Sequence, residues 1–189
     1  MKAGERRVQI LQLIVQMLEN PKGEKITTAA LAAKLDVSEA ALYRHFASKA
    51  QMFEALIEFI EETVFGLINQ ISSKEPQGIA QVQAMLGMLL GFAAKNVGMT
   101  RVLIGDALVG ENERLQARVT QLSDRIETSV KQALRIAITQ GTVAADTDVA
   151  AYANLLVCYV TGRWHQFVRS GFKKNPLEGF EAQWRLLIG

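Results

Sequence analysis

Cysteine is nearly absent from this chain, and this limits both its covalent structure and its chemistry. Cys158 is the only cysteine among the 189 residues, so no intrachain disulfide can form. It falls in the apolar run 153–160, which predicts a buried structural thiol rather than a reactive one. Only two histidines are present, and no HxxxH or CxxC spacing occurs, so we expect neither a metal site nor a cofactor.

Sequence signatures of enzymes, membrane spans and secretion are also missing. No glycine-rich phosphate loop and no Ser/His/Asp arrangement stands out, so we expect a protein that is not an enzyme. No run approaches the roughly 18 apolar residues that a membrane span needs. Near the start, Glu5, Arg6 and Arg7 interrupt the apolar core that a signal peptide requires. The expected location is therefore the cytoplasm.

A large net charge is missing too, but the charges are unevenly distributed. The formal net charge of +2 is too small for a protein that coats nucleic acid along its whole surface. Residues 1–50 carry eight Lys or Arg against five Asp or Glu, a balance of +3. Residues 51–75 carry one Lys against five Glu, a balance of −4. Any contact with DNA is therefore expected within about the first fifty residues.

Proline is rare, and the segments between Pro21, Pro76 and Pro176 show helical rather than strand periodicity. The pattern predicts turns at 20–23 and 72–78. It predicts helices at about 6–19, 49–71, 79–95, 100–109, 112–140, 148–170 and 180–187. The expected fold class is all-α, with a small first domain at residues 1–48 and a helical second domain at residues 49–189.

Residues 26–49, ITTAALAAKLDVSEAALYRHFASK, have the pattern of a helix-turn-helix. Thr27 or Thr28 can cap the first short helix, because a hydroxyl accepts a hydrogen bond from an unpaired helix N–H. Ser38 can cap the second, at about 39–46, where Leu42 and Phe46 lie four residues apart and bury one face. The other faces carry residues suited to phosphates and base edges: Ala40, Tyr43, Arg44 and His45.

A long apolar stripe runs along the predicted helix at 112–140. Its members recur at steps of four, three, four, four and four residues, and we call them the 115–134 stripe: Leu115, Val119, Leu122, Ile126, Val130 and Leu134. Such a stripe must be buried against another helix. Because two helix-turn-helix heads usually read successive turns of a palindromic operator, we predict that the stripe and the helix at 148–170 form a homodimer interface. Packing inside one protomer is the alternative.

The stretch ITTAALAAKLDVSEAALYRHFASKAQMF resembles TetR-type regulators, which join a three-helix DNA-binding head to an all-helical dimerisation domain. Three further blocks resemble the nucleoid-occlusion factors of this fold: LIEFIEE at 56–62, GFAAKNVGMTRVL at 91–103 and NERLQARVTQLSDRIE at 112–127. Those factors bind chromosomal sites and antagonise the division protein FtsZ. The resemblance implies a dimeric, nucleoid-associated protein that binds double-stranded DNA at specific sites and inhibits FtsZ ring assembly.

The resemblance also implies roles for individual residues. The positions that address DNA in this fold are occupied by Thr27, Thr28, Ser38, Ala40, Tyr43, Arg44, His45 and Lys49. Lys49 matches a position that holds a phosphate through its ammonium group and a helix N-terminus. The surface associated with FtsZ matches at Phe59, Gly91, Lys95 and Asn96. The chain departs from the pattern at Leu67, where a basic residue is expected.

A small-molecule ligand is an alternative partner for the helical domain. The residues suited to an apolar cavity are Met85, Met88, Met99, Tyr152, Cys158 and Trp164. The same residue types at helical spacing are more common in an ordinary core. A ligand-responsive repressor and an interaction module with a vestigial head therefore stay open beside the nucleoid-occlusion hypothesis.

Overall fold

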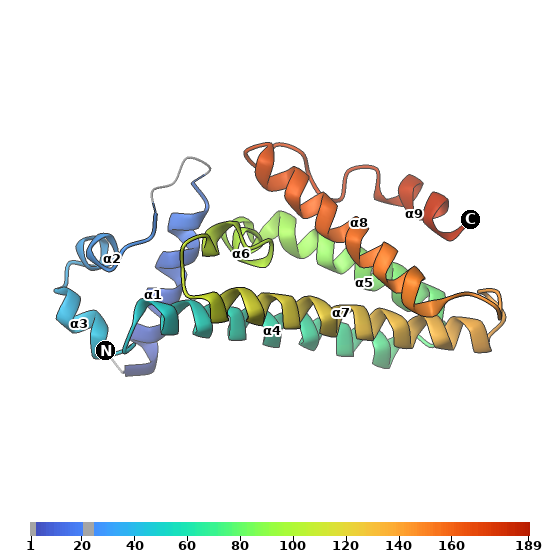
Figure 1. The fold of residues 1–189 in the computed structure, drawn as a ribbon, viewed down its shortest axis with the longest axis horizontal. Helices are drawn as coiled ribbons and strands as arrows, with labels where there is room; N and C mark the ends of the chain where they lie inside the picture. The colour runs from blue at the N-terminus through green and yellow to red at the C-terminus, as the bar shows by residue number, and fades with distance from the viewer. Residues whose placement is uncertain (1–2, 21–24) are drawn as a thin grey trace. The chain divides into compact units, whose positions relative to one another are not determined.

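The computed structural model describes residues 3–20 and 25–189, so most of the predicted turn at 20–23 lies outside the described residues. Every regular element in this part of the chain is helical, which confirms the all-α prediction (Figure 1). The elements are α1 (Ala3–Leu18), α2 (Thr28–Leu35), α3 (Glu39–Tyr43), α4 (Lys49–Lys74), α5 (Gly78–Lys95), α6 (Val97–Leu103), the 3₁₀ helix η1 (Asp106–Leu108), α7 (Glu113–Thr139), α8 (Val149–Arg169) and α9 (Phe180–Ile188).

Two of the predicted hydroxyl caps start the helices of the helix-turn-helix. The side chain of Thr27 accepts a hydrogen bond from the amide of Ala30 at 3.1 Å, so Thr27 rather than Thr28 caps α2. The side chain of Ser38 accepts one from the amide of Ala41 at 3.2 Å and caps α3. These bonds satisfy helix N–H groups that have no partner inside the helix.

Several predicted helices have different bounds in the structure. The helix predicted at 49–71 continues to Lys74, so the predicted turn at 72–78 is shorter than expected, and the helix predicted at 6–19 begins at Ala3. The second helix of the helix-turn-helix, predicted at 39–46, ends at Tyr43, and a tighter turn follows in which the amide of His45 bonds to the carbonyl of Leu42. The helix predicted at 100–109 is divided between α6 and η1. Gly105 lies between them with a φ of 77°, a conformation that favours glycine and cannot continue an α-helix.

The chain divides into two compact units, and α4 and α7 contribute to both. Unit 1 comprises residues 1–60 and 97–119, and unit 2 comprises residues 61–96 and 120–189. Unit 1 thus joins the head to α6, because α6 packs on α1. Gly98 permits this packing, since a Cβ atom there would overlap the carbonyl oxygen of Val15. The predicted boundary between residues 48 and 49 stays a prediction.

In unit 2, α5 and α8 pack against each other (Figure 1). The indole Nε1–H of Trp164 donates a hydrogen bond to the carbonyl of Leu89 at 3.2 Å in the buried contact. At the start of α5, a Cβ atom on Gly78 would overlap the backbone of Ala133 and Ala137. By length and composition alone α5 could cross a membrane, but half of its 18-residue apolar window is buried inside the protein. That burial is typical of a core helix.

The 115–134 stripe lies in the core of a single chain, which contradicts its assignment to a dimer interface. All six side chains are between 0 and 6% exposed: Leu115, Val119, Leu122, Ile126, Val130 and Leu134. A side chain buried to this degree inside one protomer has no surface left for a second chain. Packing inside the protomer therefore accounts for the stripe. The prediction for Cys158 was also wrong, because its thiol is exposed on α8.

Candidate nucleic-acid interface

The short helix α3 and the residue after it carry side chains that the sequence assigns to DNA. Leu42 and Phe46 are both 1% exposed and hold this segment against the rest of unit 1. Ala40, Tyr43 and Arg44 are exposed, as the predicted amphipathic pattern requires. The arrangement gives a small side chain, a phenol and a guanidinium access to solvent. These groups suit close approach, a phosphate contact and a bidentate base contact respectively.

Thr28 joins the two helices of the motif. Its hydroxyl donates a hydrogen bond to the Oε2 atom of Glu39 at 2.5 Å. The bond connects the first turn of α2 with the first turn of α3. In this structure the hydroxyl of Thr28 therefore has a partner inside the protein, whereas the resemblance assigns this residue to DNA.

Arg7 of α1 holds the segment that follows α3. Its Nη1 atom donates a hydrogen bond to the carbonyl of His45 at 2.5 Å, and its guanidinium lies 4.1 Å from the ring centroid of Phe46. A cation–π contact of this kind contributes about 0.5–1 kcal/mol at an exposed site. The sequence pattern did not identify Arg7, because it lies 38 residues before its hydrogen-bond partner.

Lys49 begins α4 and forms an ion pair that the sequence pattern did not predict. Its Nζ atom lies 2.5 Å from the Oε1 atom of Glu111, in the loop before α7. The side chains of Lys49 and Glu111 are only 20% and 11% exposed. A separation of 62 residues left no local signal for this pair. The lysine expected to hold a phosphate therefore has a carboxylate partner in the DNA-free protein.

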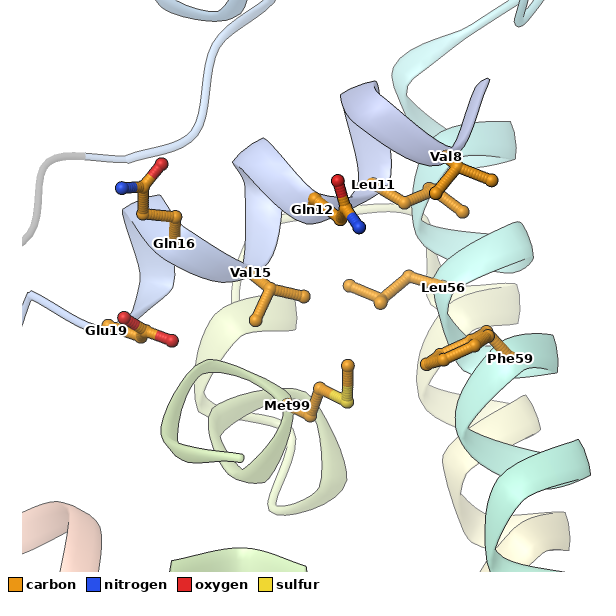
Figure 2. Close-up of a pocket in the computed structure, with 9 residues that line it drawn as sticks. All are labelled: Val8, Leu11, Gln12, Val15, Gln16, Glu19, Leu56, Phe59 and Met99. Carbon is orange, nitrogen blue, oxygen red and sulfur yellow. The ribbon is translucent and has the colours of Figure 1, made fainter. Parts of the chain in front are cut away.

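Phe59 lines an apolar groove in unit 1, between α1, α4 and α6 (Figure 2). The cavity has a volume of about 280 Å³. Its apolar lining consists of Val8, Leu11, Val15, Leu56, Phe59 and Met99, and α1 adds Gln12, Gln16 and Glu19. Phe59 is 50% exposed and Val8 54%, so large apolar surface faces solvent here. A patch of this kind is typical of an interaction site.

The other three residues assigned to FtsZ lie in unit 2. Lys95 is exposed at the end of α5, and the side-chain amide of Asn96 caps that helix by donating a hydrogen bond to the carbonyl of Phe92 at 2.8 Å. A Cβ atom on Gly91 would lie 3.6 Å from Leu177, an ordinary contact. Because Phe59 belongs to unit 1, neither unit contains all four residues.

The six residues considered for a ligand cavity have different surroundings. Met85 and Trp164 are buried core residues of unit 2, whereas Cys158 is exposed. Met99 lines the groove of unit 1. Met88 lines two shallow grooves of unit 2, one of which also contains Leu67. The hydroxyl of Tyr152 donates a hydrogen bond to the carbonyl of Leu187 at 2.9 Å. The six residues therefore do not form one shared cavity.

Comparison with known proteins gives matches over nearly the whole chain. The model for bacterial regulatory proteins of the tetR family matches residues 24–56, and the SlmA-like model, a tetracyclin repressor-like C-terminal domain, matches residues 76–189. The nucleoid occlusion factor SlmA of Alteromonas mediterranea is 52% identical over 183 residues, which are 97% of this chain and 94% of that protein. SlmA of a Marinomonas species is 50% identical over 186 residues, with coverages of 98% and 94%.

Solved structures show the same architecture. The fatty acid degradation regulator FadR of Bacillus halodurans superposes with a TM-score of 0.81 and is 16% identical in sequence. The match covers 100% of this chain and 97% of that structure. At this identity the likeness shows the fold alone.

Proposed function

The chain belongs to the TetR-type SlmA family of nucleoid occlusion factors, and we propose that it binds a palindromic operator on the nucleoid and inhibits FtsZ assembly there. It is a DNA-binding protein rather than an enzyme. The observation that carries the proposal is the capped helix-turn-helix with Ala40, Tyr43 and Arg44 exposed, in a chain about half identical to SlmA proteins. Its place of action is the cytoplasm, where it is bound to the chromosome.

We assign the DNA contacts by the chemistry of each side chain. Tyr43, His45 and Lys49 bind phosphates, and the residues nearest the bases are Thr28, Ser38, Ala40 and Arg44, with Thr27 at the start of α2 beside them. Phosphate contacts supply affinity for any sequence, whereas base contacts supply specificity. This division can be tested one residue at a time.

Substitution of Arg44 tests the base contacts most directly. A bidentate contact to guanine contributes about 1–3 kcal/mol of discrimination. Arg44→Ala should therefore weaken binding to the selected operator about 5- to 150-fold and leave binding to an unrelated duplex nearly unchanged. Sites selected from random DNA provide the operator, and a titration against both duplexes gives the ratio. If the ratio of the two affinities is unchanged, Arg44 does not contact the bases.

The homodimer interface requires a surface other than the 115–134 stripe. The exposed residues of α8 include a set at steps of four, three, four and three residues, which occupies one side of the helix: Ala151, Leu155, Cys158, Gly162 and His165. We call this set the α8 face. Leu155 is 55% exposed although it is large and apolar. Next to this face, the amide of Asn154 donates a hydrogen bond to Glu127 of α7 at 3.1 Å.

Gly162 points to a second copy as the occupant of the α8 face. A glycine in the middle of an α-helix costs about 1 kcal/mol relative to alanine. In one protomer no other element explains this cost, because a Cβ atom on Gly162 would meet none within 4 Å. Gly66 on α4 is equally open, but Gly162 lies on the same side of its helix as the 55% exposed side chain of Leu155. Small residues allow two helices to approach closely, and a two-fold axis would pair the α8 faces of two protomers. We therefore assign the dimer interface to this face.

We assign the docking of FtsZ to the groove that contains Phe59, with Gly91, Lys95 and Asn96 as further contacts. The groove offers apolar surface on three helices to a partner (Figure 2). Phe59→Ala removes a ring that is half exposed and contacts the groove from α4, so binding of FtsZ should weaken about tenfold or more, as expected for loss of an interface aromatic.

The matched control for this substitution is Leu186→Ala. Leu186 is an 83% exposed apolar residue of α9 that does not line the groove, so its loss should leave FtsZ binding unchanged. Direct binding to labelled FtsZ, with DNA binding measured in parallel, separates the two surfaces. Equal effects of the two substitutions would exclude the groove as the docking site.

A further inference from the structure

We propose that Glu111 competes with DNA phosphate for Lys49 and thereby lowers the affinity of the free protein for DNA. The proposal rests on the role of Lys49 as a phosphate ligand, which is assigned above. Lys49 and Glu111 both belong to unit 1, and their charged atoms lie 2.5 Å apart. In the DNA-free protein the carboxylate therefore takes one of the three N–H donors of the ammonium group and offsets the positive charge that attracts a phosphate.

Carboxylate and phosphate groups bind a lysine ammonium in the same way. Each is an oxyanion that accepts a short, charge-assisted hydrogen bond of about 2.8 Å. If Lys49 kept its bond to Glu111 while it bound a phosphate, the two anions would lie on the order of 4 Å apart around one nitrogen. This separation is well within the Debye length of about 8 Å, so salt would not screen their repulsion. This repulsion weakens the bond between Lys49 and a phosphate for as long as Glu111 stays bound, so release of Glu111 should strengthen it.

The backbone of Glu111 is held by its neighbours in the loop, and the longer side chain of Lys49 is the one that can reach away from it. The amide of Glu111 donates a hydrogen bond to the carbonyl of Leu108 at 3.0 Å. On one side, Gly110 turns the chain with a φ of 74°. On the other side, the Oδ1 atom of Asn112 accepts a hydrogen bond from the amide of Arg114 at 3.0 Å and starts α7. Lysine has a long flexible stem, and it can turn its ammonium group from the carboxylate to the DNA.

The same loop lies close to a second basic residue of the head. A Cβ atom on Gly110 would lie 3.5 Å from the Nζ atom of Lys25, which precedes α2. Because Glu111 follows Gly110 in this loop, its negative charge lies near the basic N-terminal segment. Its effect on the net charge of the DNA-binding surface adds to its direct bond with Lys49.

The experiment compares four proteins: the unchanged chain, Glu111→Gln, Lys49→Gln and the double variant. Affinity for one fixed random-sequence duplex is measured by fluorescence anisotropy at several salt concentrations, because phosphate contacts exist on any sequence. An ion pair near a surface changes an equilibrium by about 1.4- to 5-fold. We expect Glu111→Gln to tighten binding by that factor for each head, and by its square for a dimer that uses two heads. Lys49→Gln should weaken binding.

The matched control is Glu113→Gln, which removes the same charge two residues away, from an exposed side chain at the start of α7. It should change affinity much less than Glu111→Gln. In the Lys49→Gln background, Glu111→Gln should have no further effect, since the ion pair is already absent. A second variant, Glu111→Asp, keeps the charge but shortens its reach, and it should give an intermediate affinity. Thermal melting of each variant shows that it is folded.

Three results would overturn the proposal. Weaker binding by Glu111→Gln would mean that Glu111 positions Lys49 for the phosphate. An increase in DNA affinity equal to that of Glu113→Gln would mean that Glu111 acts only through the net charge of the surface. A gain that persists in the Lys49→Gln background would show that Lys49 is not the group released. If Lys49→Gln alone leaves DNA affinity unchanged, the phosphate role of Lys49 fails instead, and this outcome is distinguishable from the other three.

Discussion

Substitution of Gly162 by leucine should have opposite effects on the monomer and on the dimer. In one protomer the new side chain projects into open space, because nothing lies within 4 Å of its Cβ position. Leucine is a better helix former than glycine, so the monomer should be stabilised by about 0.5–1 kcal/mol. If the α8 faces of two protomers meet at Gly162, the same side chain enters a close helix contact. Overpacking of such a contact costs about 1–3 kcal/mol, and a two-fold axis applies it twice.

The predicted net result is a dissociation constant for the dimer raised at least about 30-fold, which corresponds to about 2 kcal/mol. Sedimentation equilibrium over a range of protein concentrations gives this constant. Urea unfolding at a concentration well below it gives the stability of the monomer, since the stability of a dimer depends on concentration. The control is Gly66→Leu on α4, where a Cβ atom also meets nothing within 4 Å and which lies outside the α8 face. It should stabilise the chain without changing dimerisation. Undiminished dimerisation of the Gly162→Leu protein would refute the assignment of the interface.

Two further predictions concern stability. Gly98→Val should destabilise the protein by about 2 kcal/mol or more in urea unfolding, because α6 must move away from the carbonyl of Val15. Gly91→Ala, whose new methyl group makes only an ordinary 3.6 Å contact inside α5, should instead stabilise it by up to about 1 kcal/mol. The pKa of Glu127 is lowered by hydrogen bonds from Lys131 and Asn154. It therefore contributes stability that is present above the pKa of the unfolded chain and is lost as pH falls through the lower pKa of the folded chain. Asn154→Ala removes one of these bonds, so it should reduce the loss of stability at acidic pH. The urea unfolding midpoints of the two proteins are compared from neutral to acidic pH. An equal fall of the midpoint in both proteins would show that the bond does not contribute.

Features encoded by a few neighbouring residues could be predicted from the sequence. The caps at Thr27 and Ser38 depend on a hydroxyl and on amides only three residues away, and both form as expected. The positions of the long helices follow from apolar periodicity in the same way. The break at Gly105 was missed, because a single glycine inside an apolar helical pattern does not by itself determine the sign of φ.

Features that depend on distant partners could not be predicted. The 115–134 stripe indicated a buried face, but periodicity does not distinguish burial inside one chain from burial between two. Lys49 and Glu111 are 62 residues apart, and only the folded chain brings their charges together. The exposure of Cys158 and Gly162 has the same origin, since it depends on which side of α8 the rest of the protomer covers.

The proposed function requires that this protein, bound to its operator, inhibits assembly of FtsZ. The most direct measurement is sedimentation of FtsZ polymers formed with GTP in the presence of the protein and a duplex selected from random DNA. We expect the DNA-bound protein to lower the amount of pelleted FtsZ, and the Phe59→Ala protein bound to the same duplex to lower it much less. An amount of pelleted FtsZ that is the same with and without the DNA-bound protein would refute inhibition of FtsZ assembly.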